Sequence, residues 1–115
     1  MWLVPTDVTA GLAGTILVID DERNIRRTLR IVLEGEGATV LDAETAEQGL
    51  QLIEASLSGK NIGEPRIQVV MADVLLPGMS GLQLLEKMYA LGGGTPPLPV
   101  ILISGHATVS DAVRA

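Results

Sequence analysis

The chain has 115 residues, enough for one domain, and 47% of them are hydrophobic, which excludes a disordered chain and allows a buried core. Eight basic and fourteen acidic residues give a net charge of −6, which argues against nucleic acid as a direct partner but is compatible with a bound divalent cation. The sequence has no cysteine, no secretory signal and no apolar stretch near the ~18 residues of a membrane span, so we expect a cytoplasmic domain without disulfides or thiolate zinc sites.

The first half of the chain predicts a tail followed by a strand and a helix. Residues 1–14 are expected to form an N-terminal tail, and residues 15–115 a domain. The continuous apolar run over residues 15–20 is typical of a strand buried on both faces. A helix follows, because four apolar residues recur with helical spacing before Gly35. These residues are Ile25, Leu29, Val32 and Leu33.

Strands and helices continue to alternate along the rest of the chain. The further strands are predicted over residues 38–41, 67–72 and 99–104, and the further helices over residues 46–57, 82–88 and 107–115. In the third helix, Leu82, Leu85 and Met88 are expected to form the apolar face. Because strands that alternate with helices make right-handed crossovers, this order predicts an α/β fold with a parallel sheet covered on both faces.

Acidic and hydroxyl side chains follow three of the predicted strands. Asp20 and Asp21 follow the first strand, Asp73 the third and Ser104 the fourth. Ligands of such sheets bind beyond the carboxyl ends of the strands, so we expect these groups to meet in one pocket, with Asp73 facing solvent. Three close carboxylates repel one another unless a cation lies between them, which favours Mg²⁺. A carboxylate beside Mg²⁺ can also attack phosphorus and form an aspartyl-phosphate.

Each of these residues has a simpler interpretation when it is considered alone. Asp20 and Asp21 could cap the helix that follows them, and Asp73 could be an ordinary turn residue. Ser104 could mark the start of a helix. It is their joint placement at three strand ends that favours a phosphoacceptor site. A group of arginines in the first helix is expected to form a solvated face: Arg23, Arg26, Arg27 and Arg30.

Three motifs occur in the same order as in a known family. They are residues 18–22, Asp73 with Pro77 and Gly81 after it, and residues 101–105. Together they strongly resemble the receiver domain of bacterial two-component response regulators, and residues 104–108 look most like receivers of the nitrogen-regulation type. The resemblance implies a three-layer flavodoxin-like, doubly wound parallel sheet with strand order 2-1-3-4.

The resemblance also implies a role for each acidic residue. Asp73 would be the phosphoacceptor. Asp21 and Asp73 would bind Mg²⁺ directly, together with the backbone carbonyl of Leu75, and Asp20 would bind it through water. The metal would neutralise charge on the transferring oxygens.

The remaining implications concern the switch and its partners. Ser104 would bind a phosphoryl oxygen as the switch hydroxyl, and Gly105 would leave room for the phosphoryl group. A sensor histidine kinase would donate that group, and an output domain, expected to be transcriptional, would respond to it. The resemblance implies a signalling domain rather than an enzyme, with only self-catalysed phosphoryl transfer and autodephosphorylation.

The family pattern extends further than this chain. A fifth strand, the lysine at its end and a fifth helix have no counterpart before Ala115, so we expect an incomplete receiver whose output domain is missing. Its open fourth strand is expected to favour a homodimer or a strand-exchanged association.

Two other functions stay open. The chain could be a receiver-like docking or dimerisation module that takes no phosphate. It could also be an Mg²⁺-dependent phosphatase with an aspartate nucleophile, although such enzymes usually carry Asp-x-Asp after the first strand, where this chain has Asp20, Asp21 and Glu22.

Overall fold

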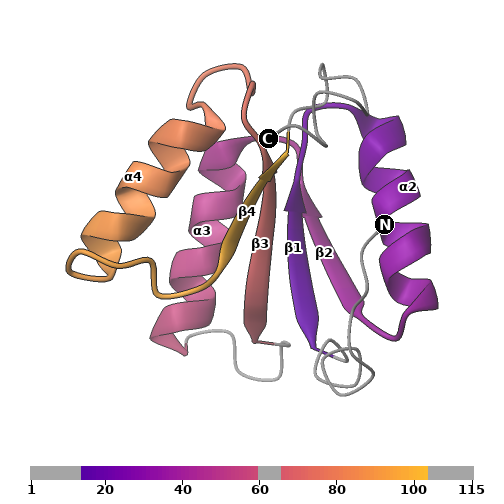
Figure 1. Ribbon diagram of the computed structural model, residues 1–115, viewed down its shortest axis with the longest axis horizontal. Coiled ribbons are helices and arrows are strands. Elements are labelled where there is room, and N and C mark those ends of the chain that lie inside the picture. Colours follow the sequence, from indigo (N-terminus) through magenta and orange to yellow (C-terminus); the bar gives the residue numbers. More distant parts are fainter. Residues whose placement is uncertain (1–13, 60–65, 104–115) are drawn as a thin grey trace, which may run out of the picture.

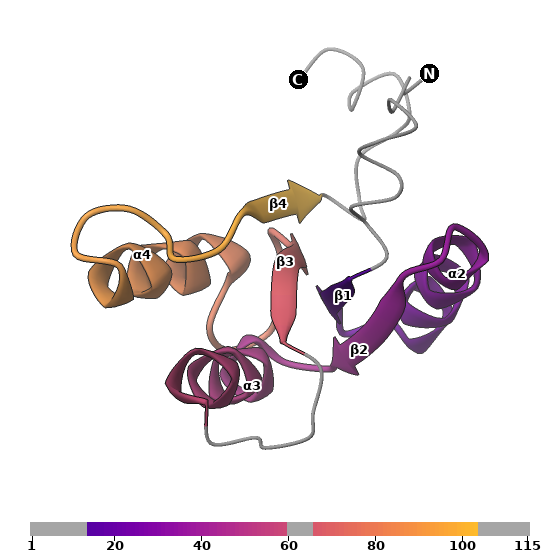
Figure 2. The same cartoon turned by 90° about the horizontal axis from the view of Figure 1, so that it is seen from below.

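The computed structural model describes residues 14–59 and 66–103, which form a four-stranded parallel sheet of order β2-β1-β3-β4 (Figure 1). The strands are β1 (Thr15–Ile19), β2 (Thr39–Ala43), β3 (Ile67–Asp73) and β4 (Val100–Ile103). The helices among these residues are α2 (Arg23–Gly35), α3 (Ala46–Ser58) and α4 (Gly81–Leu91). Figure 2 shows α2 on one side of the sheet and α3 and α4 on the other. The flavodoxin-like architecture and the predicted strand order are therefore confirmed.

Local signals in the sequence set the ends of the helices. The Thr45 side chain accepts a hydrogen bond from the Gln48 backbone N–H at 3.1 Å and so caps α3. Gly59 ends α3 in the left-handed conformation, with a φ of 70°. Ser80 and Gln83 form a reciprocal capping box at the start of α4. Strand β2 runs two residues beyond its predicted end, because its ladder with β1 continues to the pair Ile19–Ala43.

The main core lies between the sheet and the pair α3 and α4. Leu17 and Ile19 of β1 pack there with Ile53 of α3 and with Leu84 and Met88 of α4, all of them fully buried. The apolar face predicted for the third helix is wrong at one position, because Leu82 is 54% exposed and Leu84 points into the core. The first residue of α4, Gly81, packs directly against the end of β3.

The opposite face of the sheet has a smaller core. Ile16 and Val18 are buried against Leu29 and Leu33 of α2, which are themselves only partly covered. No residue of α2 is fully buried, and Val32 of the predicted apolar stripe is 56% exposed. Figure 2 shows α2 beside β1 and β2 rather than over β3 and β4.

Several expectations fall on other parts of the chain. Residues 1–13 of the expected tail, Ser104, Gly105 and the helix expected over residues 107–115 lie outside the described residues. Strand β4 forms one edge of the described sheet, and the association expected through it stays a prediction. Among the residues that the structure describes, no helix has the length and apolar character needed to cross a membrane.

Candidate phosphoacceptor and metal site

Three carboxylates meet at the carboxyl ends of β1 and β3. These strands are neighbours, and their register pairs Ile19 with Ala72, so that Asp20 and Asp73 follow side by side. One oxygen from each of Asp20, Asp21 and Asp73 lies within 4.8 Å of the other two. The expected convergence of the three aspartates is confirmed.

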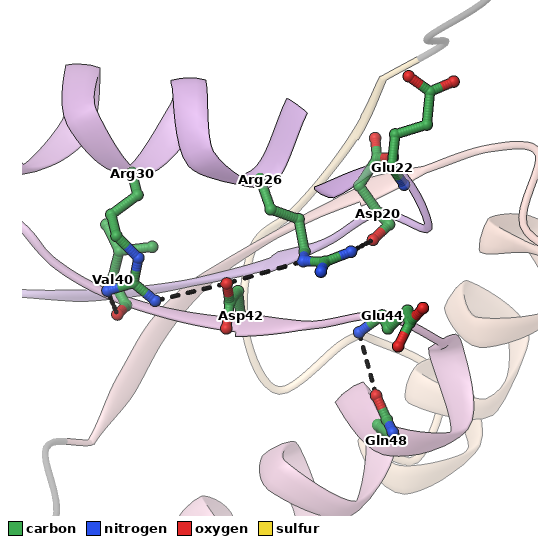
Figure 3. Close-up of polar contacts among 8 residues, drawn as sticks. All are labelled: Asp20, Glu22, Arg26, Arg30, Val40, Asp42, Glu44 and Gln48. Carbon is green, nitrogen blue, oxygen red and sulfur yellow. Dashed lines mark hydrogen bonds and ion pairs between the residues drawn. The ribbon is translucent and has the colours of Figure 1, made fainter. Parts of the chain in front are cut away.

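Asp20 is fixed at three of its polar atoms. Its backbone N–H donates to the Ala43 carbonyl at 3.1 Å, which extends the ladder with β2. Its backbone carbonyl accepts from the Arg26 guanidinium at 2.7 Å, and its Oδ1 accepts from the Glu22 N–H at 2.8 Å (Figure 3). The N-cap of α2 is Glu22, so the simpler interpretation of Asp20 and Asp21 as the helix cap is wrong.

The fourth polar atom of Asp20 points to the chemistry of the site. Its Oδ2 is buried and has no hydrogen-bond partner within the part of the chain that the structure describes. Burial raises the pKa of this carboxyl; the Glu22 N–H opposes the rise, and the charges of Asp73, Asp21 and Glu22 add to it. A buried, unpartnered oxygen beside two further carboxylates fits a hard divalent cation, because Mg²⁺ prefers oxygen ligands. The residues therefore fit a metal of this class.

Asp73 is buried rather than facing solvent as expected, because it is only 2% exposed. Its Oδ1 accepts from the Leu75 backbone N–H at 3.0 Å, so it also makes the local turn that the simpler interpretation predicts. Asp21 is exposed, and the cluster reaches the molecular surface at that residue.

The segment after Asp73 is held from two sides. The Val74 N–H donates to the carbonyl of Ile103 at 2.8 Å, which joins this segment to the end of β4. The Met79 N–H donates to Glu47 Oε1 of α3 at 2.8 Å. A Cβ atom at Gly81 would overlap the Asp73 carbonyl oxygen, which explains why glycine stands there.

Sequence reasoning missed two residues that support the site. Glu47 carries no local signal, since its partner Met79 lies 32 positions away. Arg26 was grouped with the solvated arginines, yet its side chain is only 15% exposed and contacts Asp20. Only the exposed Arg23 and Arg27 fit the expected solvated face.

The other sequence-predicted site residues are only partly placed. Leu75 directly follows the Asp73 turn, with its side chain 55% exposed. Ser104 and Gly105 lie outside the described residues, but Ile103 before them pairs with Asp73 in the sheet. The fourth strand therefore ends at the acidic cluster, as the sequence predicts.

Two curated relatives cover nearly the whole chain. It is 35% identical over 103 residues to the C4-dicarboxylate transport transcriptional regulatory protein DctD of Rhizobium meliloti, which covers 90% of this chain and 20% of the relative. It is 33% identical over 102 residues to the DNA-binding transcriptional regulator NtrC of Escherichia coli, covering 89% and 19% respectively. The chain thus spans about one fifth of the length of these relatives.

Solved structures agree with the fold. A response regulator receiver domain protein from Clostridium thermocellum is 32% identical and superimposes with a TM-score of 0.63, covering 88% of this chain and 72% of that one. The receiver domain of the histidine kinase CKI1 from Arabidopsis thaliana gives a TM-score of 0.70 over 97% of this chain and 79% of that one; at 22% identity it supports the fold alone. The family model described as the response regulator receiver domain matches residues 16–115, and this chain belongs to that family.

Proposed function

We propose that the chain is the phosphoacceptor part of a two-component response regulator, with Asp73 as the residue that is phosphorylated. The observation that carries this proposal is the meeting of Asp20, Asp21 and Asp73 within 4.8 Å of one another, with an Asp20 oxygen that has no hydrogen-bond partner among the described residues. Membership of the receiver family supports the same function.

Mg²⁺ is the cofactor proposed for this cluster. Asp21 and Asp73 would bind it directly together with the Leu75 backbone carbonyl, and Asp20 would bind it through water. When bound, the ion supplies positive charge beside the three equatorial oxygens of the transferring phosphoryl group. The hydrogen bond from the Leu75 N–H to Asp73 Oδ1 fixes the carboxylate plane. Among the described residues this is the only hydrogen bond to the Asp73 carboxylate, so we assign the attack to Oδ2.

In the proposed phosphoryl transfer, the chain supplies the attacking carboxylate and positions it for the donor. The donor proposed is the phosphohistidine of a sensor histidine kinase, which approaches on the exposed Asp21 side. A bond forms between an Asp73 oxygen and phosphorus, the phosphorus–nitrogen bond breaks, and its electron pair stays on the histidine nitrogen. The step as written moves no proton between the two residues, so it needs no general base.

Ser104 and Gly105 are proposed to complete the site. Ile103 pairs with Asp73, so the next residues along the chain start from the edge of the cluster. The Ser104 hydroxyl would bond a phosphoryl oxygen, and Gly105 would leave space for it. The relatives are transcriptional regulators about five times as long as this chain, so we propose that the phosphorylated receiver controls a transcriptional output domain.

The test is phosphorylation by a small donor. The chain is incubated with Mg²⁺ and acetyl phosphate, and intact mass is measured together with the heat of Mg²⁺ binding. We expect one phosphoryl adduct in the wild type and none in Asp73→Asn. Glu54→Gln serves as the control, because that carboxylate is exposed on α3 outside the cluster and should leave the adduct intact.

Each other outcome points to a different function. An adduct that persists in Asp73→Asn removes Asp73 as the phosphoacceptor. Steady release of many phosphates per chain favours the aspartate-nucleophile phosphatase. Failure of the wild type to bind Mg²⁺ favours the docking or dimerisation module.

A further inference from the structure

We infer that Arg26 is a positioning residue for the metal site: it holds the Asp20 main chain, so that the free Asp20 oxygen faces the other carboxylates. This inference rests on the proposed Mg²⁺ site. It adds a role for an arginine of α2 that lies outside the acidic cluster and contacts none of its carboxylates in the described structure.

The contact between Arg26 and Asp20 is short and well covered. The guanidinium donates to the Asp20 carbonyl at 2.7 Å, a typical length for a charge-assisted hydrogen bond, and the Arg26 side chain is 15% exposed. Strand β1 ends at Ile19, and within the described part of the chain the Arg26 guanidinium is the partner of the Asp20 carbonyl. Without Arg26, this carbonyl loses its partner at the point where the chain turns toward Asp21.

Arg26 is itself held by β2. Its Nε lies 3.7 Å from Asp42 Oδ2, and Figure 3 shows Asp42 between the two guanidinium groups of Arg26 and Arg30. Three elements therefore meet at one side chain: α2 supplies Arg26, β2 supplies Asp42, and β1 ends at the carbonyl that Arg26 holds. How α2 is seated on β2 thus determines the geometry of Asp20.

Arg30 provides a matched control one turn further along the same helix. It donates to a main-chain carbonyl, that of Val40, at 2.9 Å, and lies 3.5 Å from the same Asp42 carboxylate. Like Arg26, it contacts one main-chain carbonyl and the Asp42 carboxylate, but both of its contacts lie on β2, away from the acidic cluster. A loss of α2 anchoring alone would affect both arginine variants similarly.

The direction of the change separates positioning from simple electrostatics. Deleting a guanidinium removes positive charge near a cation site, and Coulomb's law then predicts tighter Mg²⁺ binding. Misplacing Asp20 predicts weaker binding, because residues that orient metal ligands typically change affinity by about 10–100-fold. The two explanations therefore predict opposite signs.

The experiment measures the Mg²⁺ dissociation constant by calorimetry for the wild type, Arg26→Met, Arg26→Lys and Arg30→Met. We expect Arg26→Met to weaken binding by about tenfold. Arg26→Lys keeps a charged donor and should lie between it and the wild type, and Arg30→Met should bind as the wild type does. Thermal unfolding in chelator should show similar losses for Arg26→Met and Arg30→Met.

Two results would overturn the inference: an Arg26→Met variant that binds Mg²⁺ as tightly as the wild type or more tightly, or equal weakening in Arg26→Met and Arg30→Met. If Arg26→Met does not fold, the comparison of Arg26→Lys with Arg30→Lys decides in the same way. A wild type that binds no Mg²⁺ contradicts the proposed function itself, which keeps the two failures distinct.

Discussion

The two faces of the sheet are held by different forces. On the α3 and α4 side, fully buried Ile53, Leu84 and Met88 pack into one continuous apolar core. On the α2 side no helical residue is fully buried, and Arg26 and Arg30 instead donate to main-chain carbonyls at the end of β1 and on β2. The pair α3 and α4 is thus fixed by a fully buried apolar core, whereas α2 combines partly covered apolar contacts with polar contacts to the sheet.

The difference matters because the acidic cluster depends on both sides. Asp73 ends β3, and its main chain is in close contact with α4 at Gly81. Asp20 directly follows β1 and is bonded to α2 through Arg26. Substitutions in the core beside α3 and α4 should therefore mainly lower the free energy of unfolding. Substitutions of the polar residues on α2 should mainly change the geometry of the metal site.

The largest expected effect lies in the apolar core. Ile53→Ala should lower the free energy of unfolding by about 2–5 kcal/mol, because a fully buried side chain leaves a cavity. Leu33→Ala on α2 should cost about 1 kcal/mol, since Leu33 is only partly covered. Urea denaturation measures both. Equal losses of unfolding free energy in the two variants would contradict the contrast between the two faces of the sheet. If Ile53→Ala does not fold, Ile53→Val serves instead, with an expected loss of about 0.5–1.5 kcal/mol.

The second effect concerns the contact of α4 with β3. Gly81→Ala should cost about 1–3 kcal/mol, because the new methyl group overlaps the backbone carbonyl of Asp73 and the chain must shift. Gly35→Ala at the end of α2 is the matched control. Nothing lies within 4 Å of a Cβ at Gly35, so the change should stabilise the protein by about 0.5 kcal/mol. A neutral Gly81→Ala would show that the close approach is not required.

The third substitution is expected to stabilise the folded chain in chelator, whereas Ile53→Ala and Gly81→Ala destabilise it. Asp20→Asn should raise the free energy of unfolding in chelator by about 1–3 kcal/mol, because it removes a buried charge whose Oδ2 has no partner among the residues that the structure describes. The same variant should lose the stabilisation that Mg²⁺ gives the wild type. Thermal melts with chelator and with Mg²⁺ test both halves. Asp42→Asn, at a partly exposed site, should show no gain in chelator.

The pH dependence follows from the raised pKa of Asp20. The folded chain holds the Asp20 proton to higher pH than the unfolded chain, so the unfolding free energy falls as pH rises between the ordinary aspartate pKa and the raised one. The advantage of Asp20→Asn in chelator should therefore grow through that range and level off above it. An advantage that stays constant from acidic to neutral pH would contradict the raised pKa.

Much of the fold was predictable because its signals are local. Thr45 marks the start of α3 by its side-chain cap and Gly59 its end by a left-handed backbone conformation, and β1 is one short, mostly apolar run that is buried throughout. The acidic cluster was predictable too, since the parallel topology alone brings the residues after β1 and β3 to one edge.

The remaining features depend on contacts between distant parts of the chain. Leu82 and Leu84 are equally apolar in the sequence, and it is the packing of α4 against the sheet and α3 that buries Leu84 and leaves Leu82 exposed. Likewise Arg26 is one of several arginines, and its role depends on where α2 meets Asp42 of β2. No spacing along the helix carries that information.

The smallest expected effect tests whether α2 is stabilised by its own surface pairs. Arg30 Nη1 and Glu34 Oε2 lie 3.8 Å apart, but both side chains are more than one third exposed. Glu34 also places negative charge in the last turn of α2, where the helix dipole disfavours it. Glu34→Gln should therefore change the unfolding free energy by less than about 0.5 kcal/mol. Arg30→Met should cost about 1 kcal/mol, since it also removes the bond to the Val40 carbonyl. Urea titrations of both variants at low and high salt distinguish the surface pair from the bond to the sheet. Equal losses that shrink at high salt would assign the stability of α2 to charge pairs on its surface rather than to its bonds with the sheet.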